Sequence, residues 1–167
     1  MKFKFTIQPY QTEAVNAVVN VFAGQPYVDN KTYQRNIEID KDLTNWQIAD
    51  DELKSGYANA AVQLSSQQLL ANIRKIQGQN NIKLSEALTD SLGACSIDVE
   101  METGTGKTYV YIKTIFELNR QYGWSKFIVV VPSVAIREGV RKSFDTMQEH
   151  FMEHYGKKAR FFIYNSS

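Results

Sequence analysis

Hydrophobic positions near the start of the chain follow first the period of a strand and then that of a helix. Between Lys2 and Ile7, apolar residues alternate with polar ones, which predicts a half-buried strand. Pro9 then stands where a helix is favoured to begin. The apolar residues that follow recur at helical spacing: Ala14, Val15, Val18, Val19 and Phe22. We expect this helix to end at Gly24 and Pro26.

The middle of the chain is less regular. Residues 24 to about 62 are polar and acidic, although Trp46 and Ile48 favour local packing over a free linker. Apolar residues at helical spacing then predict a second helix from Ser65 to Gln77, and we expect a shorter helix from Ser85 to Leu92. These elements show no internal repeat.

From residue 96 onward the pattern alternates between strand and helix. Strands are expected at residues 96–101, 126–131 and 159–164. Helices are expected from about Gly106 to Tyr122 and from about Val134 to Tyr155. The middle strand is a continuous, largely β-branched run, which is typical of a strand buried on both faces. This order predicts an α/β fold, a parallel sheet with helices on both faces, preceded by a mainly helical N-terminal segment.

The change of pattern divides the chain into an N-terminal segment, residues 1–95, and the first part of the α/β domain, residues 96–167. Charge divides in nearly the same way. Residues 1–100 hold nine Lys or Arg against twelve Asp or Glu, whereas residues 101–167 hold ten against six. The overall charge of +1 excludes wholly electrostatic binding of nucleic acid. We therefore expect an anionic partner on the second part.

The composition is that of a folded protein without a disulfide framework. Of the 167 residues, 43% are hydrophobic and 22% are charged, which excludes global disorder. A single cysteine excludes a disulfide framework and a Cys-based metal site within the chain. No apolar run reaches the ~18–20 residues that span a bilayer, and the first residues lack the apolar centre of a secretion signal. We expect no membrane association and a cytoplasmic location.

The sharpest chemical signal runs from Met101 to Thr108, between a predicted strand and a predicted helix. Gly104 and Gly106 allow the backbone to curl so that successive N–H groups converge on an anion. Lys107 is expected to reach the β- and γ-phosphates of a nucleotide, and the Thr108 hydroxyl to ligate Mg²⁺. The predicted phosphate-binding residues are Thr103, Gly104, Thr105, Gly106, Lys107 and Thr108, with catalytic roles for Lys107 and Thr108.

This motif departs from the strict phosphate-loop pattern, which has glycine where Met101 stands. The alternative interpretation is a Gly-rich turn that caps a helix and binds nothing. Helicase superfamily 2 proteins commonly replace that glycine and use Thr-Gly-x-Gly-Lys-Thr, as in residues 103–108. The wider sequence resembles the restriction (Res) subunit of type III restriction-modification enzymes. The resemblance is carried by residues 72–77, 101–111, 116–119, 122–123 and 126–140, and it covers most of the chain, most densely from 96 to 165.

The resemblance implies part of a RecA-like P-loop NTPase domain. It implies ATP and Mg²⁺ as cofactors, and double-stranded DNA and the methylation (Mod) subunit of the same system as partners. An ATP-dependent restriction endonuclease of this family couples hydrolysis to movement or switching on DNA. The acidic Mg²⁺-binding motif, the arginine fingers and the nuclease site do not follow in this chain. We therefore expect a fragment of the first motor domain that is inactive alone.

The resemblance also gives a role to Gln11. The stretch Pro9-Tyr10-Gln11 is similar to the adenine-reading element upstream of the phosphate loop in these proteins. A glutamine amide offers one donor and one acceptor group, so it can pair with two atoms of the adenine edge. On residue type alone, an ordinary polar residue in a first helical turn is the simpler interpretation.

A candidate DNA contact follows the predicted strand at 126–131. Pro132, Ser133 and Arg137 stand where the resembling proteins place their first strand-contacting motif. The Ser133 hydroxyl and nearby backbone N–H groups are suited to bind a phosphate of DNA. The alternative is that Ser133 caps the next helix, and both roles are compatible. Arg137, Arg141 and Lys142 also fit an ordinary solvated helix face.

The other reactive side chains are expected to be structural. His150 and His154 lie four residues apart, a spacing that suits a metal, but no third ligand is evident. Cys95 is expected to be a small packing residue. Phe161, Phe162 and Tyr164 are expected to belong to a strand.

Two other functions use the same motifs. The first is another superfamily 2 DNA helicase or repair motor. A nuclease domain further along the polypeptide would favour a restriction subunit over this alternative. A non-catalytic nucleotide-binding module is the other, and it would bind ATP without turnover. A P-loop metabolic kinase is disfavoured, because the Thr-Gly-Thr-Gly-Lys-Thr form and the Pro-Ser element indicate a motor.

Overall fold

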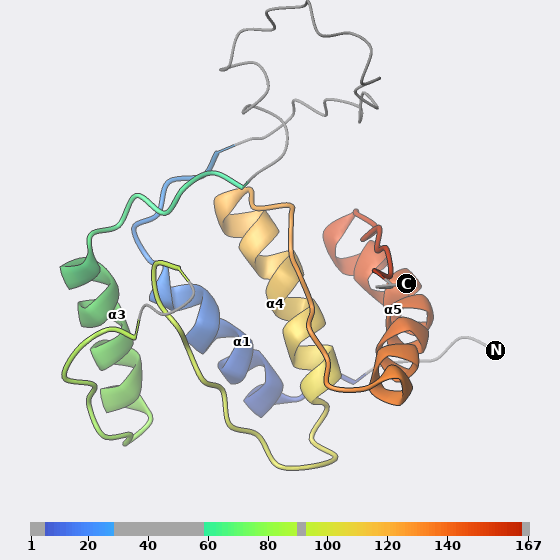
Figure 1. Ribbon diagram of the computed structural model, residues 1–167, viewed down its shortest axis with the longest axis horizontal. Helices are drawn as coiled ribbons and strands as arrows, with labels where there is room; N and C mark the ends of the chain where they lie inside the picture. Colours follow the sequence, from blue (N-terminus) through green and yellow to red (C-terminus); the bar gives the residue numbers. More distant parts are fainter. Residues whose placement is uncertain (1–5, 29–58, 90–92, 165–167) are drawn as a thin grey trace, which may run out of the picture.

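A computed structural model describes residues 6–28, 59–89 and 93–164 of the chain. The described residues form four helices (Figure 1). These are α1 (Pro9–Val21), α3 (Ser66–Gln79), α4 (Lys107–Tyr122) and α5 (Val134–Tyr155). Helix α1 packs against α3 and α4, and α4 packs against α5, so the helices form one row in the order α3, α1, α4, α5.

Three of the helices point the same way. In Figure 1, α1, α4 and α5 all begin towards the lower edge of the view. Helices α4 and α5 share this direction because the segment after α4 returns along that helix before α5 begins. Consecutive helices that pack directly through a short turn would run antiparallel. The starts of α1 and α4 lie together, since Gln11 contacts Thr105, whereas α4 begins beside His150 and Phe151, in the last third of α5.

The contact between α1 and α4 forms the first of two apolar clusters. Its buried residues come from both helices and from the segment after α4: Val15, Val19, Val110, Leu118, Tyr122 and Trp124. The Tyr122 hydroxyl donates to the Val19 carbonyl oxygen at 2.9 Å, so the buried phenol keeps a partner. The predicted apolar stripe of the first helix is confirmed, since Val15 and Val19 are each 1% exposed.

Helix α3 begins where a capping signal stands in the sequence. The Ser65 side chain accepts from the backbone N–H of Gln68, and the Gln68 side chain accepts from the backbone N–H of Ser65. The buried Leu69 anchors this helix, and the Asn72 amide donates to the carbonyls of Val21 and Ala23 at 2.9 and 3.0 Å. The second predicted helix is therefore confirmed, and it is fixed to the end of α1.

The second apolar cluster lies between α4 and α5. It contains Tyr109, Ile112, Phe116, Met147 and Phe151. The Phe151 ring stacks on Phe116, with ring centroids 4.8 Å apart, and on Tyr109 at 5.5 Å. A polar contact adds to this packing, because the Tyr155 hydroxyl donates to Glu117 Oε1 at 2.7 Å.

The predicted α/β fold with its parallel sheet is wrong for the described residues, which contain helices and no strand. The segments 96–101, 126–131 and 159–164 are extended, but no second strand lies alongside any of them in the described part of the chain. A strand needs a neighbour that completes its backbone hydrogen bonds, and the side-chain pattern alone does not supply one. Ile128, Val130 and Phe162 accordingly face solvent, with exposures of 91%, 86% and 91%.

Two further expectations concern short elements. Most of the strand predicted at 2–7 lies outside the described residues, and residues 6 and 7 form no strand. The helix predicted at 85–92 is wrong over 85–89, and residues 90–92 lie outside the described part. The Arg74 guanidinium donates to the carbonyls of Ser85 and Glu86 at 2.8 and 3.0 Å, so this segment follows α3 as a loop.

None of the helices in the described residues is long and apolar enough to cross a membrane.

We predict that Phe151→Ala destabilises the chain strongly. Phe151 is 2% exposed, and its removal leaves a cavity between α4 and α5, which costs about 3–5 kcal/mol. Urea denaturation of both proteins measures this difference. Met152→Ala is the matched control, because Met152 is 40% exposed on the same helix and should change stability little. Equal effects of the two substitutions would contradict the assigned core.

Candidate phosphate-binding site

The Gly-rich segment forms a tight loop directly before α4. Gly104 and Gly106 have φ angles of 84° and 86°, in the left-handed region that favours glycine. The Thr105 hydroxyl donates to the Glu102 carbonyl oxygen at 2.6 Å and closes the turn between these glycines. Thr103 and Gly104 are exposed at its tip. The predicted Gly-rich turn is confirmed, and the structure adds that both glycines are left-handed.

The start of α4 carries backbone donors without a side-chain cap. Gly106 occupies the N-cap position and has no side chain that could accept from the first turn, and that turn contains no acidic residue. The first N–H groups of a helix have no intrahelical partners, and they carry partial positive charge. This arrangement at the end of a glycine loop is suited to bind an anion.

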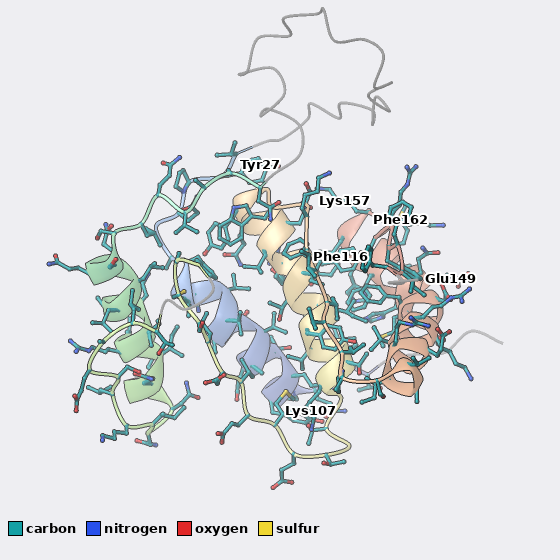
Figure 2. All side chains as sticks on the ribbon, viewed as in Figure 1. Tyr27, Lys107, Phe116, Glu149, Lys157 and Phe162 are labelled. Carbon is teal, nitrogen blue, oxygen red and sulfur yellow. The ribbon has the colours of Figure 1, made fainter. Side chains whose placement is uncertain are left out.

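Lys107 folds back over the loop. Its ammonium group donates to the carbonyl oxygens of Met101 and Glu102, each at 2.9 Å. Figure 2 shows Lys107 at the lower end of α4, beside the loop. Both partners are neutral carbonyls, so the positive charge of the ammonium is not neutralised by these two contacts.

Thr108 is half-buried, one turn before Tyr111 on α4. Burial raises the pKa of the Tyr111 phenol, and the neighbouring Thr108 hydroxyl opposes this rise in part. Thr108 therefore stands close to Tyr111, at the N-terminal end of α4.

Gln11 reaches this loop from the first turn of α1. Its Nε2 donates to the Thr105 carbonyl oxygen at 2.9 Å, and the residue is 9% exposed. A Cβ atom built on Gly106 would lie 2.5 Å from Gln11 Nε2, so the amide occupies space that only glycine leaves free. The structure thus brings Gln11 to the predicted phosphate loop across more than 90 residues of sequence.

The structure adds two residues that the sequence patterns did not single out. The Tyr10 hydroxyl donates to the same Thr105 carbonyl at 3.2 Å. Lys113 on α4 is 9% exposed, and its ammonium donates to the Thr12 hydroxyl at 3.1 Å. Helical spacing could have found Lys113, because it lies between the apolar positions Ile112 and Phe116. The contact of the Tyr10 hydroxyl with the loop follows only from the packing of α1 beside the loop, which the sequence does not show.

The candidate DNA-contact residues lie at the start of α5. Pro132 is an exposed residue in a bend, and the Ser133 hydroxyl accepts from the backbone N–H of Ile136 at 3.3 Å, which makes Ser133 the helix cap. Arg137 forms an ion pair with Glu138 at 3.3 Å, and Arg141 lies 3.7 Å from the other oxygen of the same carboxylate. They belong to a different element from the phosphate loop, which precedes the α4 turn that contacts His150 and Phe151 in the last third of α5.

His150 takes part in the contact between α4 and α5, and His154 lies beside it on α5. The Tyr109 hydroxyl lies 3.1 Å from His150 Nε2, and burial together with the nearby His154 lowers the pKa of His150. The side chain of His154 bonds to the backbone carbonyl of His150 at 2.8 Å. Among the described residues, no group of three or more His, Cys, Asp or Glu is placed to hold a metal ion.

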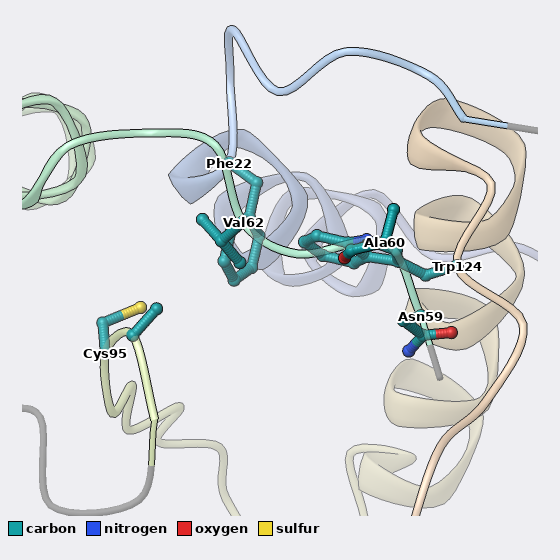
Figure 3. A pocket seen from close by; sticks show the side chains of 7 residues that line it. Phe22, Asn59, Ala60, Val62, Cys95 and Trp124 are labelled. Atoms are coloured by element: carbon teal, nitrogen blue, oxygen red, sulfur yellow. Dashed lines mark hydrogen bonds between the residues drawn. The ribbon is translucent and has the colours of Figure 1, made fainter. Parts of the chain in front are cut away.

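Cys95 is half-buried at the edge of a small apolar hollow of about 250 Å³, which Figure 3 shows together with Phe22 and Trp124. The polar groups around the hollow already have partners. The Trp124 indole donates to the Ala60 carbonyl at 3.0 Å, and the Asn59 side-chain oxygen accepts from the backbone N–H groups of Ser125 and Lys126 at 2.9 Å each. The hollow is therefore a packing feature, and burial raises the pKa of the Cys95 thiol.

The glycine loop, the uncapped helix start and the lysine together form a candidate anion-binding site. The family described as "Type III restriction enzyme, res subunit" matches residues 4–164. The chain belongs to this family.

Curated relatives agree with that assignment. The Res subunit of the type III restriction-modification enzyme EcoP15I from Escherichia coli is 39% identical over 97% of this chain and 15% of its own length. The EcoPI Res subunit of Escherichia phage P1 is 36% identical over 95% of this chain and 14% of its own length. The StyLTI Res subunit of Salmonella typhimurium LT2 is 52% identical over 36% of this chain. The chain spans about one seventh of the length of the first two relatives.

We predict that Gly106→Ala disrupts the loop more than Gly104→Ala. Both positions have positive φ, so each alanine carries a backbone cost of about 1–2 kcal/mol. At Gly106 the new methyl group also meets the Gln11 amide, whereas the space beside Gly104 is open. Thermal unfolding of the two variants should therefore give the lower melting temperature for Gly106→Ala. Equal melting temperatures would contradict this prediction and show that the Gln11 side chain moves aside at little cost.

Proposed function

We propose that this chain is the N-terminal part of the ATP-dependent motor of a type III restriction endonuclease subunit. It binds ATP with Mg²⁺ through Thr103–Thr108 and couples the nucleotide to movement or switching on double-stranded DNA. DNA cleavage belongs to another part of the subunit. The observation that carries the proposal is the loop itself, in which two left-handed glycines lead into an uncapped helix start beside Lys107.

The residues of the loop fit a nucleoside triphosphate. Backbone N–H groups at the start of α4 donate to phosphate oxygens, and the helix dipole favours the negative charge. Lys107 exchanges its bonds to the two carbonyls for bonds to the β- and γ-phosphates, because a charge-assisted bond to an anion is stronger than a bond to a neutral carbonyl. The Thr108 hydroxyl is the Mg²⁺ ligand, and bound Mg²⁺ neutralises the phosphate charge.

Gln11 is the proposed adenine-reading residue. Its amide nitrogen donates to the Thr105 carbonyl, so it links the base to the phosphate loop through one side chain. We further propose that residues 1–95 carry this element together with a family-specific helical insertion. Residues 96–167 form the first part of the motor domain. The insertion is a candidate contact for the methylation subunit or for DNA.

Pro132, Ser133 and Arg137 are the proposed DNA contacts. Helix α5 runs in the same direction as α4, and the phosphate loop lies nearer to His150 and Phe151 than to the start of α5. A DNA phosphate at Ser133 would meet the first backbone N–H groups of α5. The DNA contact would then be separate from the nucleotide site, with most of the length of α5 between them.

We predict that Lys107→Ala abolishes ATP hydrolysis by the intact protein, because no other side chain of the loop carries a positive charge to the phosphates. A steady-state assay of phosphate release with DNA present measures the effect. Lys158→Ala is the matched control, since Lys158 is exposed and lies in the segment after α5. Wild-type turnover in Lys107→Ala would contradict the proposal. ATP binding without turnover in the wild-type protein would instead indicate a non-catalytic nucleotide-binding module.

We predict that two substitutions of Ser133 separate capping from DNA binding. Aspartate keeps the cap of α5 but repels a phosphate, whereas alanine loses the cap at a cost of about 1 kcal/mol. Ser133→Asp should therefore retain the wild-type melting temperature and weaken DNA binding by the intact protein in a fluorescence-anisotropy titration. Unchanged DNA affinity in Ser133→Asp would leave Ser133 with a capping role only.

A further inference from the structure

The carbonyl oxygen of Thr105 is held by two consecutive residues of α1. Tyr10 donates its hydroxyl at 3.2 Å and Gln11 donates its amide at 2.9 Å. A carbonyl oxygen has two lone pairs, so these two donors together complete its hydrogen bonding. Both donors come from the first turn of a helix that is more than 90 residues away in the sequence.

These two bonds set the direction of one peptide group. The described residues contain no cis peptide bond, and in a trans peptide the C=O of Thr105 and the N–H of Gly106 point in opposite directions. With the carbonyl directed at α1, the Gly106 N–H is directed away from α1. The N–H that an anion in the loop would use is therefore oriented by side chains of α1.

The first turn of α1 is itself fixed in place. The Thr12 hydroxyl accepts from the buried Lys113 ammonium of α4 at 3.1 Å, and Val15 lies in the core one turn further on. Tyr10, by contrast, is 45% exposed, so its ring adds little to the core. The hydrogen bond from the Tyr10 hydroxyl to the Thr105 carbonyl therefore matters more for this residue than apolar packing.

We infer that Tyr10 is a positioning residue of the nucleotide site, which acts on the phosphates by orienting the peptide between Thr105 and Gly106. The inference rests on the proposed function and extends it to a residue outside the loop. Because Tyr10 acts through the loop and not through the base, its hydroxyl contributes equally to the binding of ATP and of GTP. Gln11, which is proposed to read adenine, contributes unequally to the two.

The test uses Tyr10→Phe in the intact protein, which removes the hydroxyl and keeps the ring. A neutral hydrogen bond of this kind corresponds to about a two- to tenfold change in affinity. We therefore expect ATP and GTP, each titrated as a fluorescent analogue, to bind two- to tenfold more weakly and by the same factor. The melting temperature without nucleotide should stay at the wild-type value. Gln11→Glu should instead change the ratio of ATP to GTP affinity.

Tyr27→Phe is the matched control, because Tyr27 is a similarly exposed tyrosine at the opposite end of α4 (Figure 2). Nucleotide affinity in Tyr10→Phe that equals that of Tyr27→Phe would overturn the inference and leave the proposed function intact. A change in the ATP to GTP ratio, or a lower melting temperature with unchanged affinity, would also overturn it. A wild-type protein that binds neither nucleotide would overturn the proposed function, and the inference with it.

Discussion

The burial of α4 on two sides is the constraint on which the other parts of this structure depend. One side packs on α1 and the other on α5, and each contact has its own apolar cluster. Two charged residues one turn apart, Lys113 and Glu117, are buried in these contacts and bond to Thr12 and Tyr155. Since a buried charge is costly without a partner, these bonds fix the rotation of α4 as well as its position.

The position of α4 determines the backbone geometry of the glycine loop before it. The loop ends at the first residue of α4, and its Thr105 carbonyl is tied to α1, so the packing of the two helices sets the geometry of the loop backbone. Helices α1, α4 and α5 share one direction (Figure 1), and the starts of α1 and α4 lie together at this loop. Partial positive charges at helix starts reinforce one another only when they lie together, and the Lys107 ammonium belongs to the same loop.

Local signals predicted the helices well and the extended segments poorly, for a physical reason. The four helices follow from apolar stripes and caps, because the hydrogen bonds of a helix are made within the segment that carries the pattern. The run from Phe127 to Val131 has the composition of a buried strand, yet its hydrogen bonds require another segment, and Ile128 and Val130 remain exposed. The capping role of Ser133 could be predicted for the same reason, because its hydrogen bond to Ile136 spans only three residues of sequence.

By itself, the sequence determined the four helices, the glycine turn before α4 and the family to which the chain belongs. Through its resemblance to that family, it also predicted that Gln11 acts together with the glycine loop. Only the tertiary structure decided that Tyr10 and Gln11 share one carbonyl, that Lys113 is bonded to Thr12, and that the extended segments run without a sheet. Short-range hydrogen bonds and periodicity depend on neighbouring residues and can therefore be predicted from the sequence. Contacts between residues about 100 positions apart form only when α1 and α4 pack together.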